Sequence, residues 1–326
     1  MGKNYFIIGG GGFIGSHLVA RILDSAQGSR VVIFDNFSSG RDWHLDGIRD
    51  NKNCSIIKGD CKDKELLTKS MQGADVVYHF ASNPDISKAI TSPEIDFWEG
   101  TYLTDCVLEA MRLNNAKMLL YASGSGVYGD VGLTEASEDY SPMKPVSTYG
   151  ASKLACEALI SAYCFMFGIN SAAFCFGNVV GPHQTHGIGY DFIKKLLDNN
   201  KELAILGDGK QSKPYIYVDD VINAMRLIEE RYLSGFSCYN VATVDYITVS
   251  EIADIVIGVM NLKNVKYVYS GGDRGWKGDV PIVRLNSGKI RGLGWNNKYN
   301  SQEAVLNSVK VMYAEAKENK FGWRKE

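Results

Sequence analysis

The sequence predicts an α/β fold in which helices cover both faces of a doubly wound parallel sheet. Short apolar runs alternate with segments of helix length through the first half of the 326-residue chain. These runs are apolar on both faces, as the buried strands of a parallel sheet require. The segments between them are long enough for the crossovers that parallel strands need. We therefore expect strands over residues 5–8, 31–34, 55–57, 76–80 and 118–121.

The pattern changes after Phe176. Glycines and Pro182 crowd the stretch from 177 to 189, and a helix over 192–199 and a strand over 215–218 are expected beyond it. We expect a first domain over residues 1–176, to which the chain returns at about 215–235. A smaller C-terminal lobe makes up most of residues 177–326, and its Lys/Glu-rich tail is expected to be solvated and frayed.

Composition and charge exclude several classes of function. The formal net charge is -2, so there is no basic bias toward nucleic acid. No apolar run approaches the roughly 20 residues that cross a bilayer, and the N-terminus leads straight into the first strand pattern without a signal segment. The 7 cysteines are scattered and never form C-x-x-C. We therefore expect a reduced, cytoplasmic protein without a membrane segment, a disulfide framework or a metal site.

A glycine-rich turn follows the first predicted strand and opens a helix; its residues are Gly9, Gly10, Gly11, Gly12, Phe13, Ile14 and Gly15. Their order fits both G-x-G-x-x-G and G-x-x-G-x-x-G. Glycine lets the backbone make such a turn and nearly touch a phosphate, and the free N–H groups of the helix attract that phosphate. The turn predicts a Rossmann-type dinucleotide site with contacts from Gly9, Gly12, Phe13, Ile14 and Gly15.

An acidic residue ends the second predicted strand. Asp35 lies where a carboxylate can accept hydrogen bonds from the ribose hydroxyls of adenosine. The same carboxylate would repel a 2′-phosphate, so we expect NAD as the cofactor. Arg41 nearby leaves NADP open.

Tyr149 and Lys153 form a Y-x-x-x-K pair, and this spacing places both side chains on one face of a helix. A phenol is a poor base at neutral pH, but a neighbouring ammonium favours the phenolate. A phenolate held there can remove a hydroxyl proton while a hydride leaves for NAD. The pair alone occurs by chance, but after a dinucleotide turn it predicts a catalytic site.

Further motifs follow along nearly the whole chain. They are Asp35-Asn36, Gly59-Asp60, His79-Phe80-Ala81, Val127-Tyr128-Gly129, Asn178 to Pro182, and Tyr217-Val218-Asp219-Asp220. Together with the glycine turn and the Tyr/Lys pair, they resemble the extended short-chain dehydrogenase/reductase family. The branch is that of NAD-dependent nucleotide-sugar epimerases and dehydratases, typified by UDP-glucose 4-epimerase.

The resemblance implies roles for residues that carry no signal of their own. On the cofactor side, the family contacts adenine at the positions of Asp60 and Cys61, and Asn36 joins Asp35 as a contact. The residues after the fourth strand would line the cofactor; they are Phe80, Ala81 and Ser82.

On the substrate side, the resemblance implies a nucleotide-diphosphate sugar. Asn178, Lys213 and Arg274 fall near the positions that hold the diphosphate, where basic residues give charge-assisted hydrogen bonds. The insertion of Trp276 and Lys277 before Gly278 leaves the register at Arg274 open.

The chain departs from the family at the third catalytic position, usually Ser or Thr. Gly124 stands there, and either neighbour, Ser123 or Ser125, could supply the hydroxyl; Ser125 is preferred. The 4,6-dehydratases add a pair ending in Glu at the positions of Ser125 and Gly126, and no carboxylate is present here.

Three other replacements set the chain apart. Phe97 stands for an Asn, Cys175 for the Arg of R-x-x-N, and Lys213 for an Arg. A lysine offers a single ammonium charge, whereas an arginine guanidinium can make two parallel hydrogen bonds to one phosphate. These replacements suggest an unusual substrate or a modified reaction.

The leading hypothesis is a nucleotide-sugar 4-epimerase, in which the hydride removed from C4 returns to the opposite face of the sugar. The alternative is a 4-dehydrogenase that releases the 4-keto sugar. A 4,6-dehydratase or reductase is the third hypothesis, and a non-catalytic NAD-sensing protein is the fourth. The family pattern also implies a homodimer formed by helices near 99–113 and 149–167, although the apolar stripe of the second helix could equally pack on the sheet.

Overall fold

The computed structural model describes residues 2–83, 85–231 and 234–323, which form two compact units. The first unit comprises Met1–Val127, Thr148–Cys175 and Ile222–Tyr239, and the second comprises Tyr128–Ser147, Phe176–Val221 and Asn240–Glu326. Residues 128–147 therefore lie with the second unit and not with the segment 1–176, and the return segment is 222–239. One reason is that Asn240 ties this stretch down, accepting a hydrogen bond from Tyr128 and donating to the Ala136 carbonyl.

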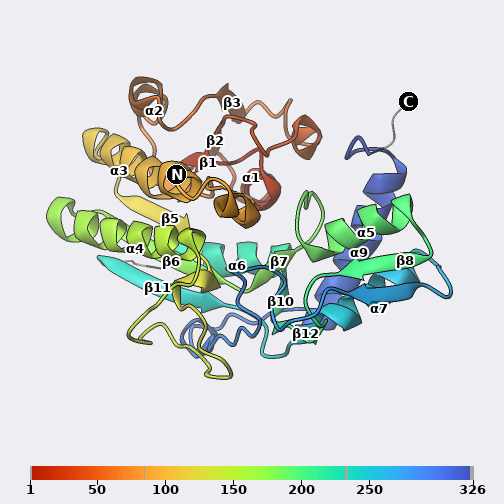
Figure 1. Cartoon of the computed structure of the whole chain (residues 1–326). Helices are drawn as coiled ribbons and strands as arrows, with labels where there is room; N and C mark the ends of the chain where they lie inside the picture. The colour runs from red at the N-terminus through yellow and green to blue at the C-terminus, as the bar shows by residue number, and fades with distance from the viewer. Residues whose placement is uncertain (1, 84, 232–233, 324–326) are drawn as a thin grey trace. The chain divides into compact units, whose positions relative to one another are not determined.

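The first unit is built on a parallel sheet of seven strands (Figure 1). In spatial order the strands are β11 (Phe236–Val241), β6 (Asn170–Phe176), β5 (Met118–Ala122), β4 (Val76–His79), β1 (Asn4–Ile8), β2 (Arg30–Asp35) and β3 (Cys54–Lys58). The chain order reverses between β1 and β4, and both neighbours run parallel to β1. The predicted doubly wound α/β fold is confirmed, and each of the five expected strands is present.

One face of this sheet is covered by α2 (Lys64–Ser70), α3 (Leu103–Leu113) and α4 (Thr148–Phe167). Side chains of alternate strand residues such as Phe6 and Ile8 pack against Val107 and Ile160 of the helices, all fully or almost fully buried. A π-helical segment, Phe97–Tyr102, precedes α3, so the expected helix over 99–113 is π-helical in its first turns.

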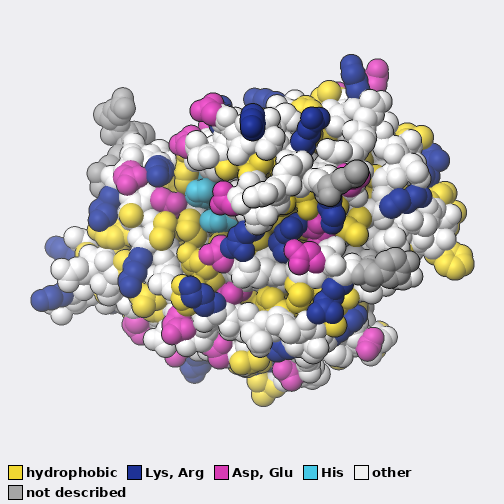
Figure 2. Space-filling view, turned by 180° about the vertical axis from the view of Figure 1, so that it is seen from behind, with side chains coloured by type: hydrophobic (Ala, Val, Ile, Leu, Met, Phe, Trp, Pro, Cys, Tyr) yellow, Lys and Arg dark blue, Asp and Glu magenta, His cyan; other side chains and the backbone are white. Residues whose placement is uncertain are grey.

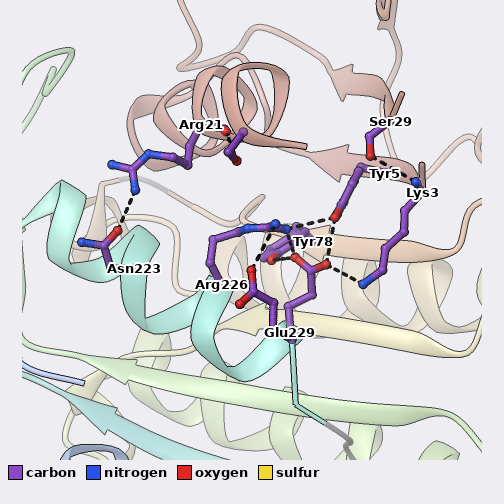
Figure 3. A network of polar contacts seen from close by, with 10 residues as sticks. Lys3, Tyr5, Arg21, Ser29, Tyr78, Asn223, Arg226 and Glu229 are labelled. Carbon is purple, nitrogen blue, oxygen red and sulfur yellow. Dashed lines mark hydrogen bonds and ion pairs between the residues drawn. The ribbon is translucent and has the colours of Figure 1, made fainter. Parts of the chain in front are cut away.

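The other face carries α1 (Phe13–Ser25) and α6 (Val218–Glu229), which are linked by a hydrogen bond from Arg21 to Asn223. Under them lies a polar network around Glu229, drawn in Figure 3. Its carboxylate accepts hydrogen bonds from Tyr5 (2.9 Å) and Tyr78 (2.7 Å) and pairs with Lys3 and Arg226. Burial alone would raise the pKa of Glu229, but these partners hold it below its ordinary value.

The second unit packs three helices around short two-stranded sheets. The helices are α5 (Ile188–Asp198), α7 (Val249–Val259) and α9 (Ser301–Lys317). The strand pairs are β7 (Asn178–Val180) with β10 (Tyr215–Tyr217), β8 (Glu202–Ile205) with β13 (Lys266–Tyr269), and β9 (Ser212–Lys213) with β12 (Ile247–Thr248). The helix expected over 192–199 starts four residues earlier, at Ile188.

The C-terminal tail is not frayed where the structure describes it, so that expectation is wrong up to residue 323. Trp323 donates its indole N–H to the Tyr190 hydroxyl at 3.1 Å. The ring of Phe321 lies 5.0 Å from that of Tyr190, centroid to centroid. The sequence expectation followed the Lys and Glu residues of the tail. Its aromatic side chains nevertheless pack and bury apolar area.

Charges of both signs are mixed on the surface. Figure 2 shows a face on which Lys and Arg side chains are interspersed with Asp, Glu and apolar ones. Within the described parts of the chain, no helix is long and apolar enough to cross a bilayer, and no cluster of acidic, His or Cys side chains could hold a metal ion.

Candidate active site

The glycine turn between β1 and α1 is closed so tightly that side chains have no room. Gly9 has φ +77°, and a Cβ on it would lie 2.9 Å from the backbone nitrogen of Ala81. A Cβ on Gly15 would lie 2.3 Å from the carbonyl oxygen of Gly9. The turn therefore brings Gly9 and Gly15 together and sets both beside the residues that follow β4.

The N-terminus of α1 is left open for an anion. Gly12 is its N-cap, no side chain caps the helix, and the first turn holds no acidic residue. The first N–H groups of a helix need partners from outside, and a phosphate is a suitable one. Phe13 and Ile14 supply two of these N–H groups, so the turn fits the pyrophosphate of a dinucleotide.

Asp35, at the end of β2, points its carboxylate at the glycine turn. Its Oδ2 accepts the N–H of Gly11 at 2.8 Å, and its Oδ1 accepts the N–H of Phe37 at 2.8 Å. Burial raises the pKa of Asp35, and the two backbone hydrogen bonds oppose that rise. A carboxylate fixed in this way next to the turn fits the ribose hydroxyls of a dinucleotide.

The other expected cofactor contacts lie around the same end of the sheet. The Asn36 amide donates to Asp60 at 3.3 Å, so these two residues meet. Phe80 and Ala81 lie against Gly9, and Ser82 follows them. Cys61 is only 5% exposed and packs in the core, where burial raises the pKa of its thiol.

Tyr149 and Lys153 stand one turn apart on α4. Lys153 is 3% exposed, and its ammonium donates to the carbonyl of Ala122 at 2.7 Å. The Nζ lies 5.6 Å from the centroid of the Tyr149 ring and 4.9 Å from that of Tyr121. The ammonium is therefore buried close to the rings of two phenols, of which Tyr149 is the partly exposed one.

The start of α4 is fixed by residues that no motif indicated. Asp96 is 2% exposed and accepts hydrogen bonds from Asn83 at 2.9 Å and from the hydroxyl of Thr148 at 2.7 Å. Ser152 donates to the Asp96 carbonyl at 2.6 Å. A Cβ on Gly100 would lie 2.2 Å from the Ser152 hydroxyl, so only glycine permits this contact. These contacts position Tyr149, which follows Thr148 directly.

The loop after β5 carries the position where the family's Ser or Thr is missing. A Cβ on Gly124 would have a single neighbour within 4 Å, Cε1 of Tyr149 at 4.0 Å. Ser123 is 5% exposed and donates its hydroxyl to Glu157 of α4. The Ser125 hydroxyl makes no hydrogen bond to any residue that the structure describes. Gly124 therefore leaves open space beside Tyr149, and Ser123 is engaged elsewhere.

The expected substrate residues gather in the second unit around a carboxylate that sequence reasoning missed. Lys213 pairs with Asp279 at 2.6 Å, and Arg274 donates to the carbonyl of Asp279 at 2.6 Å and pairs with Asp130. Asn178 donates its backbone N–H to Pro214, the neighbour of Lys213. Arg274 and Lys213 therefore share Asp279 as a partner, with the inserted residues 276–277 between Arg274 and Asp279 in the chain.

Comparison with known proteins assigns the family. A model of the NAD dependent epimerase/dehydratase family matches residues 5–242. The chain belongs to this family. Its members are NAD-dependent enzymes of the extended short-chain dehydrogenase/reductase type. The open end of α1 and the carboxylate of Asp35 fit this cofactor.

The relatives include two activities. A UDP-glucose 4-epimerase of Mycolicibacterium smegmatis is 28% identical over 93% of this chain and 96% of its own length. A human dTDP-D-glucose 4,6-dehydratase is 24% identical over 99% of this chain and 92% of its own length. A crystal structure of a UDP-galactose 4-epimerase is 36% identical, with a TM-score of 0.84, and covers 96% of this chain and 99% of its own. The chain is thus similar to both nucleotide-sugar epimerases and dehydratases.

Proposed function

We propose that this enzyme is a 4-epimerase of UDP-hexoses with Tyr149 as its catalytic base. The observation that carries the proposal is the burial of the Lys153 ammonium against the Tyr149 ring. The substrate class is supported by the UDP-sugar 4-epimerases among the relatives, one of which is 36% identical.

The two units would hold different molecules. In the first unit, the glycine turn, Asp35 and the residues after β4 would hold NAD. In the second unit, Lys213 and Arg274 would hold the diphosphate together with Asn178. Since Asp279 and Asp130 pair with these two cations, the diphosphate would replace or join carboxylates as their partner.

In the proposed reaction, the protein side chains transfer a proton at one oxygen, that of the C4 hydroxyl. Tyr149 as phenolate takes the proton of the C4 hydroxyl while the C4–H bond breaks and C4 becomes a carbonyl. NAD, held by the glycine turn and Asp35, would supply the acceptor and donor for the hydride of C4. Tyr149 then gives the proton back to the same oxygen, and the sugar has inverted at C4 if it turned over in between.

The dehydratase reaction has no support in this site. Removal of a proton at C5 and loss of water at C6 need a carboxylic acid on the loop after β5, and that stretch, Ser123 to Gly126, contains none. The reaction proposed therefore needs only the groups that α4 and this loop provide.

The open space at Gly124 favours a second candidate, a 4-dehydrogenase. A hydroxyl missing beside Tyr149 weakens the hold on the C4 oxygen, and a keto sugar held loosely can leave before the hydride returns. Ser125 is our proposed source of a replacement hydroxyl, because Ser123 is engaged with Glu157.

The test is turnover of single nucleotide sugars without added cofactor. An epimerase converts UDP-glucose to UDP-galactose under these conditions, and release of a 4-keto sugar, two hydrogens lighter by mass spectrometry, marks the dehydrogenase. Absence of either product from UDP-, dTDP-, GDP- and CDP-hexoses would exclude both functions.

We also propose that the enzyme is a homodimer formed through α3 and α4. These helices are held together by a hydrogen bond from Tyr163 to Glu109 at 2.6 Å. Large apolar side chains at their ends are exposed, among them Phe97 (51%), Trp98 (47%), Phe165 (93%) and Met166 (67%). Sedimentation equilibrium tests the proposal: Phe165→Glu should give monomers, whereas a wild-type monomer at micromolar concentration would contradict it.

A further inference from the structure

Glu157 is a buried carboxylate one helical turn beyond Lys153. It is 5% exposed, and its hydrogen-bond partners come from the loop after β5, from β6 and from β11. Its Oε1 accepts the hydroxyl of Ser123 and the thiol of Cys175 at 3.5 Å, and its Oε2 accepts the thiol of Cys238 at 3.6 Å. A carboxylate is kept inside the protein here by neutral donors.

No cation contacts Glu157 within 4.0 Å among the described residues, although a buried carboxylate ordinarily has one. The nearest cation that acts on it is Lys153, which lowers its pKa, while burial raises that pKa more strongly. Among the residues that the structure describes, the Ala122 carbonyl is the hydrogen-bond partner of Lys153. A buried carboxyl group and a buried ammonium thus stand one turn apart on one face of α4.

We propose that Glu157 is a positioning residue of the active site, which balances the charge of Lys153 and anchors the loop that faces Tyr149. The hydrogen bond from Ser123 fixes the residue next to Gly124, and the carboxyl group stands one helical turn from the buried ammonium. This inference rests on the proposed role of Tyr149 and Lys153. Glu157 touches neither substrate nor cofactor in this scheme.

The charge of Glu157 would shift the titration of its neighbours, which a purely packing side chain would not do. A negative charge near a proton-binding group makes it hold its proton more tightly, so removing the charge makes every neighbouring group release its proton at lower pH. The titratable groups that face Glu157 come from each element packed against it; they are Lys153 and the adjacent Cys156 of α4, Tyr121 of β5, Cys175 of β6 and Cys238 of β11. Tyr149 stands about two helical turns before Glu157 on α4.

The experiment measures the titration midpoint of Tyr149 from phenolate absorbance. The signal of Tyr149 is obtained by subtracting the absorbance of the same protein carrying Tyr149→Phe. In Glu157→Gln, which keeps the shape of the side chain, the midpoint should fall by about half a pH unit to one unit. Glu157→Asp keeps the charge and should keep the wild-type midpoint. The pH profile of turnover should move in the same direction in Glu157→Gln, on both limbs.

Glu229→Gln is the matched control, because it removes an equally buried carboxylate of the first unit that pairs with Lys3 and Tyr5 at the opposite end of β1 (Figure 3). Its midpoint should equal that of the wild type. Equal midpoints for folded Glu157→Gln and wild type would overturn the proposal, as would equal shifts in the Gln and Asp variants. The titration needs no substrate, so it stands even if the proposed reaction is not found.

Discussion

The ammonium of Lys153 lies 5.6 Å from the centroid of the Tyr149 ring and is held there by the carbonyl of Ala122 at 2.7 Å. Lys153 is almost completely buried, while Tyr149 is half-buried. The cation is therefore enclosed in the protein, whereas the phenol is partly exposed. In the reaction proposed above, this phenol would be the base.

Removing the phenol oxygen should abolish turnover and leave the cofactor in place. In Tyr149→Phe the ring and its contact with Lys153 remain, but no group can take the C4 hydroxyl proton. We expect kcat to fall by about 10² to 10⁴, with the Kd for NAD within about twofold of the wild type. Fluorescence titration and turnover assays measure the two quantities, and a variant that still turns over at a tenth of the wild-type rate would rule Tyr149 out as the base.

Restoring a hydroxyl at Gly124 should strengthen catalysis. The position has open space toward Tyr149, so Gly124→Ser adds a donor to the C4 oxygen without steric conflict. One transition-state hydrogen bond of about 1 kcal/mol corresponds to a rise in kcat of roughly fivefold to tenfold. Gly124→Ala fills the same space without a hydroxyl and should show no rise; equal effects of Ser and Ala would refute this reading.

Asp35 should set both the affinity for NAD and the preference over NADP. Asp35→Asn removes the charge that the ribose hydroxyls and the N–H of Gly11 share. We expect NAD to bind about 10 to 100 times more weakly, as for loss of one charged hydrogen bond, and the preference over NADP to narrow. Calorimetric titration measures both cofactors. Asp42→Asn, on an exposed ion pair with Arg49, is the control and should bind NAD as the wild type does.

His79 should make the protein less stable in acid. Burial, and then the charge of Lys153, lower the pKa of His79 to about 3, against about 6.5 in the unfolded chain. The unfolded state therefore binds the extra proton first, and stability present above pH 6.5 is lost as the pH falls. Between pH 7 and 5 the loss from this histidine is about 2 kcal/mol.

Urea unfolding at several pH values checks this expectation. His79→Gln should reduce the slope of the unfolding free energy against pH in that range, whatever its effect on the stability at pH 7. An unchanged slope in His79→Gln would show that the buried imidazole is protonated in the native state.

Glu315 should act in the opposite direction. It is 6% exposed, its Oε2 has no hydrogen-bond partner among the described residues, and burial raises its pKa to about 7. Its cost to stability appears as the pH rises from about 4.5 through 7 and is complete above that. Glu315→Gln should therefore gain stability relative to the wild type between pH 5 and 8, by about 2 to 3 kcal/mol, and thermal unfolding at both pH values measures this. A constant difference between the two proteins would contradict the raised pKa.

The sequence by itself determined the sheet and the motifs of the site, because these are local. A strand that is buried on both faces is apolar throughout. The glycines of a phosphate-binding turn are consecutive in the chain, so the sequence alone reveals them. The Tyr149–Lys153 spacing likewise encodes one helix face. The same local reasoning failed at the C-terminal tail, where charged residues hid Phe321 and Trp323, whose partner Tyr190 lies far away in the chain.

Only the tertiary structure decided which side chains complete the site. Asp96, Glu157 and Asp279 belong to no motif, and each matters through partners more than 30 residues away. The choice between Ser123 and Ser125 also depended on it, because Glu157 occupies the hydroxyl of Ser123. Charges and hydroxyls act over a few ångströms of space, and that distance is set by the packing of distant segments, which no spacing along the chain records.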